Sequence, residues 1–225
     1  MEQMIKVVVL FSRQPGLDLE AFGRHWQSTH AGLVTALPGL RRYVQSQTLA
    51  SGYRRGEPVC DGMAELWFDN TDALRALAGS PELAAVRADE ANFIDPASRL
   101  EIVVEDRLIK AGPIPPAGVK NVELVIKKPG MPVADFHRYW TEVHGPLGAA
   151  IKQIRRYVQS HTRLSAYRSG HKPALDGVAL TWFDDTDAMR ASAHSPEYAR
   201  VRADEENFLT VPLDFIITRE RVIRG

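Results

Sequence analysis

Two histidines carry the sequence pattern that most directly predicts chemistry. His30 and His144 each follow a tryptophan by four residues, a spacing that places both side chains on one face of a helix. Gly32 follows the first histidine and Gly145-Pro146 the second. Because proline lacks an N–H and displaces the preceding turn, we expect the helix to kink or end there. An imidazole at that point could move a proton near neutral pH without a metal. The alternative is a histidine that caps the broken helix by hydrogen bonding to a backbone carbonyl.

Polar side chains on the expected strands form a second group of site residues. In the expected strand Gly62–Phe68 the alternating apolar residues should face the helices, so Glu65 faces the opposite, inner side. Since buried carboxylates are costly unless paired or solvated, this inner face predicts a cavity that holds water or a small ligand. A closed, hydrogen-bonded core is the alternative, and a one-residue slip in strand phase would move every side chain to the other face. The ligand-binding residues expected on the inner face are Tyr43, Gln47, Trp67, Glu123, Tyr157, His161 and Trp182.

The predicted catalytic residues are His30, His144 and Glu65. A histidine would carry the proton, and Glu65 would be its partner or orienting group. The second half has Leu180 at the position of Glu65, and its inward carboxylate, Glu123, comes from a different strand. This difference allows one working pocket beside a structural one.

Two pairs of adjacent acids have the residue types of a carboxylate dyad. They are Asp89-Glu90 and Asp204-Glu205. Adjacent residues on a helix point about 100° apart, so we interpret both pairs as surface charges. His25 has no histidine counterpart in the second half and is interpreted as a surface residue.

The chain contains the string RRYVQS twice, at Arg41–Ser46 and at Arg155–Ser160, 114 positions apart. The strings WFD, SPE and VRADE recur in the same order at an offset of 115 positions. The period exceeds the roughly 20–50 residues of solenoid repeats, so the pattern indicates a tandem duplication of a domain-sized unit. The proline-rich segment 111–118 predicts a linker between domains at residues 1–110 and 119–225.

Each copy shows the same order of expected elements. Short valine-rich or alternating segments predict strands, and apolar residues recurring at three- and four-residue steps predict helices. The resulting β-α-β-β-α-β order is that of a ferredoxin-like unit, whose two helices leave one face of the sheet bare. Each bare face must be buried. We therefore predict an α+β protein in which two ferredoxin-like βαββαβ repeats form one intrachain eight-stranded α+β barrel. The elements expected in the first copy span 6–12, 18–37, 40–48, 62–68, 71–93 and 100–109.

Several of these strings together resemble the EthD family. The resemblance rests on HWQSTHAGLVTALPGLRRYVQSQ, DGMAELWFD, and SPE and DE before a closing strand, and it covers nearly the whole chain, once per half. It implies the dimeric α+β barrel superfamily, which includes muconolactone isomerases, aromatic polyketide cyclases, antibiotic-biosynthesis monooxygenases and haem-degrading enzymes. The resemblance thus implies ligand chemistry inside a barrel without naming the reaction. The second half departs from the pattern, reading ALTWFD in place of AELWFD.

Composition excludes several functional classes. The 28 Lys+Arg balance the 28 Asp+Glu, so no nucleic-acid partner is expected. The early apolar run is too short to span a bilayer, so no membrane partner is expected, and the one cysteine, Cys60, agrees with a reducing cytoplasm. Motifs for structural zinc or for a nucleotide loop are absent. No cofactor is expected, although haem stays open because one axial histidine leaves almost no sequence trace.

Together these observations predict a cytoplasmic protein that binds a small hydrophobic organic molecule. The first hypothesis is cofactor-free acid–base chemistry, an isomerisation, cyclisation or dehydration of a lactone or polyketide-like compound. The second is a non-catalytic binding or accessory protein that carries a hydrophobic intermediate to an oxygenase. The third is a structural module that assembles into oligomers. Because the duplication supplies an internal partner, both a monomeric pseudo-dimer and a further homodimer are allowed.

Overall fold

A computed structural model describes residues 4–225, apart from the side chain of Ser169. The chain divides into two compact units. The first runs through Val103 and includes Glu220–Gly225, and the second is Val104–Arg219. Both divisions fall inside strands. The predicted domains, 1–110 and 119–225 with a linker at 111–118, stay a prediction. Residues 1–3 of the first domain lie outside the described part of the chain.

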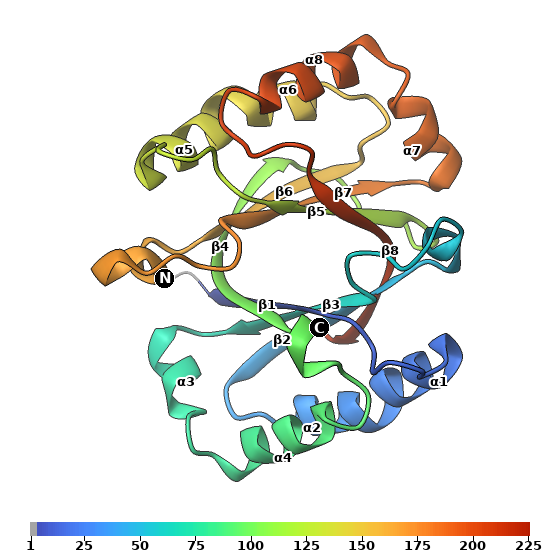
Figure 1. Ribbon diagram of the computed structural model, residues 1–225, viewed down its shortest axis with the longest axis vertical. Helices are drawn as coiled ribbons and strands as arrows, with labels where there is room; N and C mark the ends of the chain where they lie inside the picture. The colour runs from blue at the N-terminus through green and yellow to red at the C-terminus, as the bar shows by residue number, and fades with distance from the viewer. Residues whose placement is uncertain (1–3) are drawn as a thin grey trace. The chain divides into compact units, whose positions relative to one another are not determined.

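The first unit is a sheet with helices on one face (Figure 1). Its central strand, β3, pairs antiparallel with both β1 and β2. The valine-rich β1 is buried along its whole length, which suits β-branched side chains. The elements are β1 (Ile5–Phe11), α1 (Leu19–His25), a π-helical segment (Trp26–His30), α2 (Ala31–Thr35), β2 (Leu40–Thr48), a 3₁₀ turn (Ala50–Tyr53), β3 (Gly62–Phe68), α3 (Thr71–Ala76), α4 (Pro81–Glu90), a 3₁₀ turn (Pro96–Ser98) and the first part of β4 (Leu100–Lys110).

The register of these strands determines which side chains face the helices. Val7 on β1 and Tyr43 on β2 are both paired with Leu66 on β3. Directly paired residues point to the same face of a sheet. The hydrophobic core accordingly contains Val7 and Tyr43 together with helix residues such as Phe22 and Trp26. This face, packed on the helices, is called the helix-facing side below.

The helix that carries His30 does not end at the histidine. It passes from α1 through the π-helical segment Trp26–His30 directly into α2. The second unit repeats this arrangement at Trp140–His144, and Pro146 lies in the first turn of the following helix, where its missing N–H is tolerated. The expected break is therefore a π-helical insertion in a continuous helix. Such insertions occur frequently at functional sites.

The second unit repeats the same order. Its central strand β7 pairs antiparallel with β5 and β6, β5 pairs with β8, and β6 pairs with the second part of β4. Its helices also lie on one face of the sheet (Figure 1). The elements are β5 (Val119–Val125), α5 (Val133–Tyr139), a π-helical segment (Trp140–His144), α6 (Gly145–Ala149), β6 (Arg156–Thr162), a 3₁₀ helix (Leu164–Gly170), β7 (Gly177–Phe183), α7 (Thr186–Ser192), α8 (Pro196–Glu205) and β8 (Asp214–Arg224).

In hydrogen-bonded order the strands are β1-β3-β2-β8-β5-β7-β6-β4, and this order closes into a barrel. The predicted fold class is confirmed: the chain is an α+β protein in which two ferredoxin-like βαββαβ repeats form one eight-stranded barrel. Among the described residues, every helix falls short of the length and apolar character that a bilayer crossing requires.

A glycine at the start of each central strand makes room for the tryptophan of the π-helical segment. A Cβ atom on Gly62 would lie 2.6 Å from the Trp26 ring, and one on Gly177 would lie 2.7 Å from the Trp140 ring. Both tryptophans are 1% exposed, so the rings have little freedom to move away. The DG strings of the two halves thus encode a steric requirement.

Gly62→Ala and Gly177→Ala are each expected to lower the free energy of unfolding by about 1–3 kcal/mol through overpacking. Gly32→Ala is the matched control, because outside its own helix backbone and chain neighbours no described atom lies within 4 Å of a Cβ built there. Since alanine is favoured over glycine in a helix, the control should raise stability slightly. Urea unfolding of the three variants measures the difference. Equal stabilities for Gly62→Ala and Gly32→Ala would contradict the steric argument.

Candidate functional site

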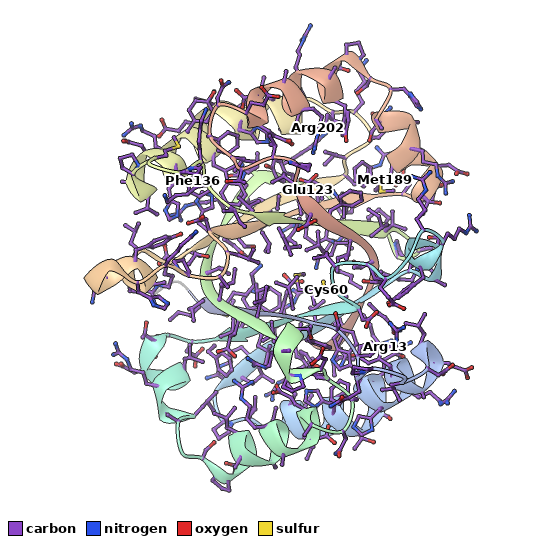
Figure 2. All side chains as sticks on the ribbon, viewed as in Figure 1. Arg13, Cys60, Glu123, Phe136, Met189 and Arg202 are labelled. Atoms are coloured by element: carbon purple, nitrogen blue, oxygen red, sulfur yellow. The ribbon has the colours of Figure 1, made fainter. Side chains whose placement is uncertain are left out.

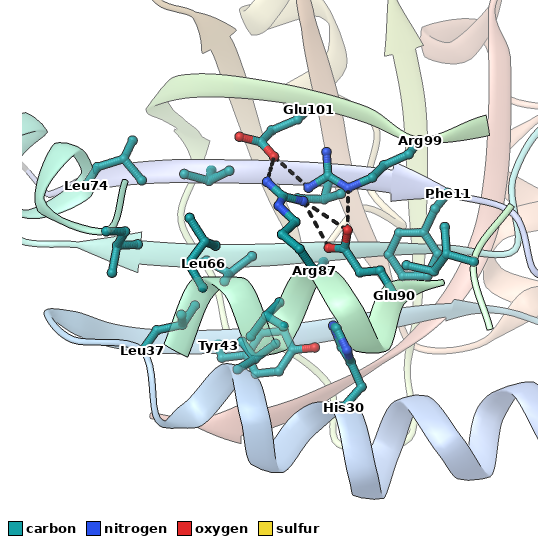
Figure 3. A pocket seen from close by; sticks show the side chains of 18 of the residues that line it. Phe11, His30, Leu37, Tyr43, Leu66, Leu74, Arg87, Glu90, Arg99 and Glu101 are labelled. Atoms are coloured by element: carbon teal, nitrogen blue, oxygen red, sulfur yellow. Dashed lines mark hydrogen bonds and ion pairs between the residues drawn. The ribbon is translucent and has the colours of Figure 1, made fainter. Parts of the chain in front are cut away.

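A cavity of about 240 Å³ lies within the first unit, on the helix-facing side of its sheet. Its walls are mostly aliphatic and aromatic, and they include Phe11, Leu37, Leu66 and Leu74 (Figure 3). Few polar side chains reach it. An apolar cavity with a small number of placed polar groups is the usual form of a small-molecule site.

His30 borders this cavity from the end of the π-helical segment (Figure 3). Its Nδ1 lies 2.9 Å from Oδ2 of Asp89 on α4. Asp89 also lies 2.9 Å from Nε2 of His25, so one carboxylate holds two imidazoles. With the Nδ1 proton of His30 donated to Asp89, its Nε2 keeps a lone pair, and no described residue hydrogen bonds to it.

Burial and hydrogen bonding determine the charges of this pair. Burial lowers the pKa of His30 and outweighs the hydrogen bond to Asp89, so the imidazole is neutral near pH 7. Burial opposes the charge of Asp89, but hydrogen bonds from His30, Asn92 and His25 lower the pKa of its carboxyl overall. A neutral imidazole oriented by an ionised carboxylate has the form of a general base.

A tyrosine supplies a second polar group in the cavity wall. The Tyr43 hydroxyl accepts hydrogen bonds from Nε1 of Trp26 at 3.2 Å and from Nε2 of Gln45 at 2.8 Å. Burial raises the pKa of Tyr43 to about 12, so the hydroxyl keeps its proton. That proton meets no acceptor among the described residues. Tyr43 can therefore donate a hydrogen bond to a molecule in the cavity.

Four charged side chains form a closed network at one wall of the first cavity (Figure 3). Arg87 contacts Glu90 at 3.0 Å and Glu101 at 2.9 Å. Arg99 contacts the same two carboxylates at 3.1 and 2.6 Å. Two cations thus balance two anions, and the wall carries no net charge.

A second cavity, of about 260 Å³, occupies the corresponding place in the second unit. His144 borders it, with Nδ1 2.9 Å from Oδ2 of Asp204. Burial lowers the pKa of His144 against the hydrogen bond to Asp204. Tyr139 donates its hydroxyl to Oδ1 of Asp204 at 2.7 Å, in the place that His25 has in the first unit. The histidine–carboxylate pair is therefore present in both halves.

The second cavity differs in its charged wall. Nη1 of Arg202 lies 2.9 Å from Oε1 of Glu205 and 3.7 Å from Oε1 of Glu123. Figure 2 shows Glu123 on β5 and Arg202 on the helix above it. Burial, and then the charge of Glu123, raises the pKa of Glu205 to about 8, and burial also raises the pKa of Glu123. One arginine here meets two carboxyl groups.

The predicted orientation of five ligand-binding residues is wrong. All five were expected on the side of the sheet away from the helices, yet the strands that carry them, β2, β5 and β6, are one residue out of the expected phase. Gln47 contacts Gln27 of the helix at 2.9 Å, and His161 stacks on Trp140. Of the five, three border the cavities. The residues that lie on the helix-facing side are Tyr43, Gln47, Glu123, Tyr157 and His161.

Glu65 does not join His30. It lies with Trp67 on the opposite face of the sheet, where its Oε1 is 3.0 Å from Nζ of Lys6 and both side chains are buried. Trp182 has the equivalent position in the second unit, 4.9 Å below Nζ of Lys120. The orientation expected for these three residues is correct, but Asp89 holds the place that was expected for Glu65. Their roles in binding or catalysis stay predictions.

The acids that hold the histidines are not the surface charges expected from the sequence. Asp89, in the pair Asp89-Glu90, is 8% exposed, and Glu205, in the pair Asp204-Glu205, is 2% exposed. The two members of each pair do point apart, one toward the histidine and the other toward an arginine. The available signal was the string VRADE, which occurs identically in both halves. Within residues 4–225, no group of three or more His, Cys, Asp or Glu side chains is arranged to hold a metal ion.

Two solved structures support the fold over 98% or more of this chain. An anthrone oxidase-like protein superposes with a TM-score of 0.64 at 11% identity, covering 100% of this chain and 95% of its own. A protein of Lactobacillus acidophilus NCFM, described provisionally as a monooxygenase, gives 0.58 at 12% identity, with 98% and 96% covered. An ethyl tert-butyl ether degradation (EthD) family protein of Bacillus halodurans C-125 is 28% identical over 46% of this chain and 98% of its own, with a TM-score of 0.39.

Sequence comparison gives the family. No curated protein sequence matches the chain. The EthD domain, in contrast, matches residues 14–97 and again residues 128–211. These ranges include both histidine–carboxylate pairs. The chain therefore belongs to the EthD family, and it carries two copies of the EthD domain in tandem.

Proposed function

We propose that each unit binds a small, largely apolar organic molecule between its sheet and its helices, and that a histidine held by a carboxylate moves a proton on that molecule. The observation that carries the proposal is the imidazole at the cavity wall, whose Nδ1 is held by Asp89 or Asp204 and whose Nε2 has no hydrogen-bond partner among residues 4–225. The reaction class is a cofactor-independent isomerisation, cyclisation or dehydration, in which a base removes a proton from carbon.

The apolar lining supports the substrate class. The cavity volumes suit a molecule of one or two small rings, and burial of its apolar surface would supply most of the affinity. Tyr43 and Tyr157 each accept a hydrogen bond from a neighbouring glutamine, at 2.8 and 3.0 Å, and keep their own proton for a ligand. A lactone or ketone oxygen is the matching acceptor.

The experiment has two stages. Mass spectrometry of the purified protein, and thermal shift with a panel of lactones and polyketide-like aromatics, identify a ligand and its product. The double variant His30→Gln/His144→Gln is then expected to bind the ligand but to turn it over about 10²–10⁴-fold more slowly. His194→Gln, at an exposed histidine, is the control and should retain full turnover. Full turnover by the double variant would overturn the proposal.

A further inference from the structure

The two cavities differ at three positions that set their charge. At an offset of 114 positions, Glu123 replaces Val9 on the first strand of the unit, Leu213 replaces Arg99, and Phe215 replaces Glu101. The second unit thereby loses one arginine and one carboxylate from the cavity mouth. It gains a carboxylate on the sheet, under the helices. In the first cavity two arginines contact two glutamates. In the second, Arg202 alone contacts two glutamates, because Arg190, which also lines the cavity, is paired with Asp187 at 2.7 Å.

A single guanidinium cannot neutralise two carboxylates, of which Glu205 is buried and Glu123 has a side chain 23% exposed. Glu205 has a side chain only 3% exposed and contacts Arg202 at 2.9 Å, while Glu123 reaches the same nitrogen at 3.7 Å. Water therefore solvates the charge of the Glu205 carboxylate poorly. Two carboxyl groups held near one cation relieve their repulsion by retaining one proton between them.

We infer that Glu123 and Glu205 share one proton and act as the general acid of the second cavity, opposite the base His144. This inference rests on the proposed function for its catalytic part. The substrate class is then an enolisable carbonyl compound, because such a reaction needs a base at carbon and an acid at oxygen. The first cavity lacks this acid and has only the Tyr43 hydroxyl to meet the carbonyl oxygen, so its turnover is expected to be slower.

The proton transfers balance without a cofactor. Nε2 of His144 takes a proton from the carbon next to the carbonyl, and that C–H bond breaks. The electron pair forms a C=C bond, and the carbonyl oxygen takes the proton that the glutamate pair held. The product is an enol, with a protonated imidazole and two ionised carboxylates left on the protein. The imidazolium then delivers its proton to a different carbon of the conjugated enol, and the enol O–H returns its proton to the glutamate pair. The carbonyl is re-formed, and the isomerisation is complete with no net oxidation.

The arrangement along α8 explains how acid and base reach the same cavity. Asp204 points to His144 and the adjacent Glu205 points to Arg202, so neighbouring residues serve opposite roles. The sheet contributes Glu123 from β5 and the Tyr157 hydroxyl from β6. The titratable and charged groups that line this cavity are Glu123 on β5, Tyr157 on β6, His144 in the π-helical segment, Arg190 on α7, and Tyr198, Arg202 and Glu205 on α8.

The shared proton can be measured without any substrate. In the full chain labelled with ¹³C at the glutamate carboxyl, one glutamate is expected to titrate near pH 8, far above the ordinary glutamate value of about 4.3. Glu123→Val, which copies Val9 of the first unit, should abolish that titration by leaving Glu205 paired with Arg202 alone. Glu90→Gln, in the first unit, is the matched control and should leave it in place. The inference would be overturned if every glutamate of the wild type titrated near the ordinary value of about 4.3. It would also be overturned if the titration near pH 8 were still present in Glu123→Val.

Turnover then separates this inference from the proposed function. Glu123→Val is expected to lower turnover about 10²-fold, with binding retained, and wild-type turnover should fall as the pH rises through the value found by NMR. If turnover depends on His144 but not on Glu123, the glutamate pair is not the general acid, and the proposed function still holds. If Glu123→Val abolishes the titration near pH 8, the shared proton is confirmed. If His144→Gln nevertheless retains full turnover, the histidine mechanism is refuted.

Discussion

Asp204→Asn is expected to lower turnover in the second cavity by a factor of about 10²–10⁴ while changing ligand affinity little. Oδ1 of Asp204 accepts from Tyr139 at 2.7 Å and from Asn207 at 3.1 Å, and an asparagine oxygen can keep both hydrogen bonds. The asparagine NH₂ would then stand beside Nδ1 of His144. Because NH₂ is a donor, the imidazole proton must move to Nε2, and the lone pair at the cavity wall is lost.

Nitrogen NMR of the histidine ring tests this mechanism directly. The wild type should carry the proton of His144 on Nδ1, and Asp204→Asn should carry it on Nε2. Asp89→Asn, the equivalent change in the first unit, is the comparison and should reduce turnover far less if the chemistry belongs to the second cavity. A tautomer that changes as expected in Asp204→Asn, with turnover intact, would show that Nε2 is not the base.

His161→Gln is expected to make the protein more tolerant of acid. His161 is 3% exposed, stacks on Trp140 with ring centroids 4.3 Å apart, and meets the edge of His137 at 4.7 Å. Burial, with the charges of His137 and Arg107, lowers its pKa to about 2. Glutamine is a safe replacement, because Gln47 has this position in the first unit.

The direction of the effect follows from proton linkage. Below about pH 6.5 the unfolded chain protonates His161 and the folded chain does not, so the free energy of unfolding falls as the pH falls. At pH 4.5, two pH units lower, the loss from this residue is about 2–3 kcal/mol, at 1.36 kcal/mol per unit. Urea unfolding at pH 8 and pH 4.5 measures it. The variant should lose about 2–3 kcal/mol less than the wild type between the two values, and His194→Gln should behave as the wild type. Equal losses would mean that His161 titrates normally in the folded state.

The fold was predictable because the same sequence strings occur in both halves of the chain. RRYVQS, WFD and VRADE recur in the same order, so each half confirms the element order of the other. Alternation along β3 separates Glu65 and Trp67 from Leu66, and the structure agrees. The π-helical segments were not predictable from the sequence. Each is only five residues long, and apolar residues four positions apart are compatible with an α-helical as well as a π-helical turn.

The site was only partly predictable, for a physical reason. All seven residues of β1 are buried, so its sequence IKVVVLF carries no contrast between its two faces. Periodicity therefore could not show which face of the sheet Val9 occupies, nor which face its counterpart Glu123 occupies in the second unit. Asp89 and Asp204 were missed because burial of a helical acid depends on the partner that crosses it. That partner is the histidine that the π-helical segment presents.

The presence of both EthD domains in one polypeptide has a consequence for how such a protein can diversify. In a symmetric pair of identical chains, a mutation that installs a carboxylate in one cavity installs it in the other as well. Here Glu123 has no counterpart in the first unit, and Arg99 has none in the second. Covalent duplication thus lets a lineage specialise one cavity and keep its twin as it was, a division of labour that a homodimer cannot encode.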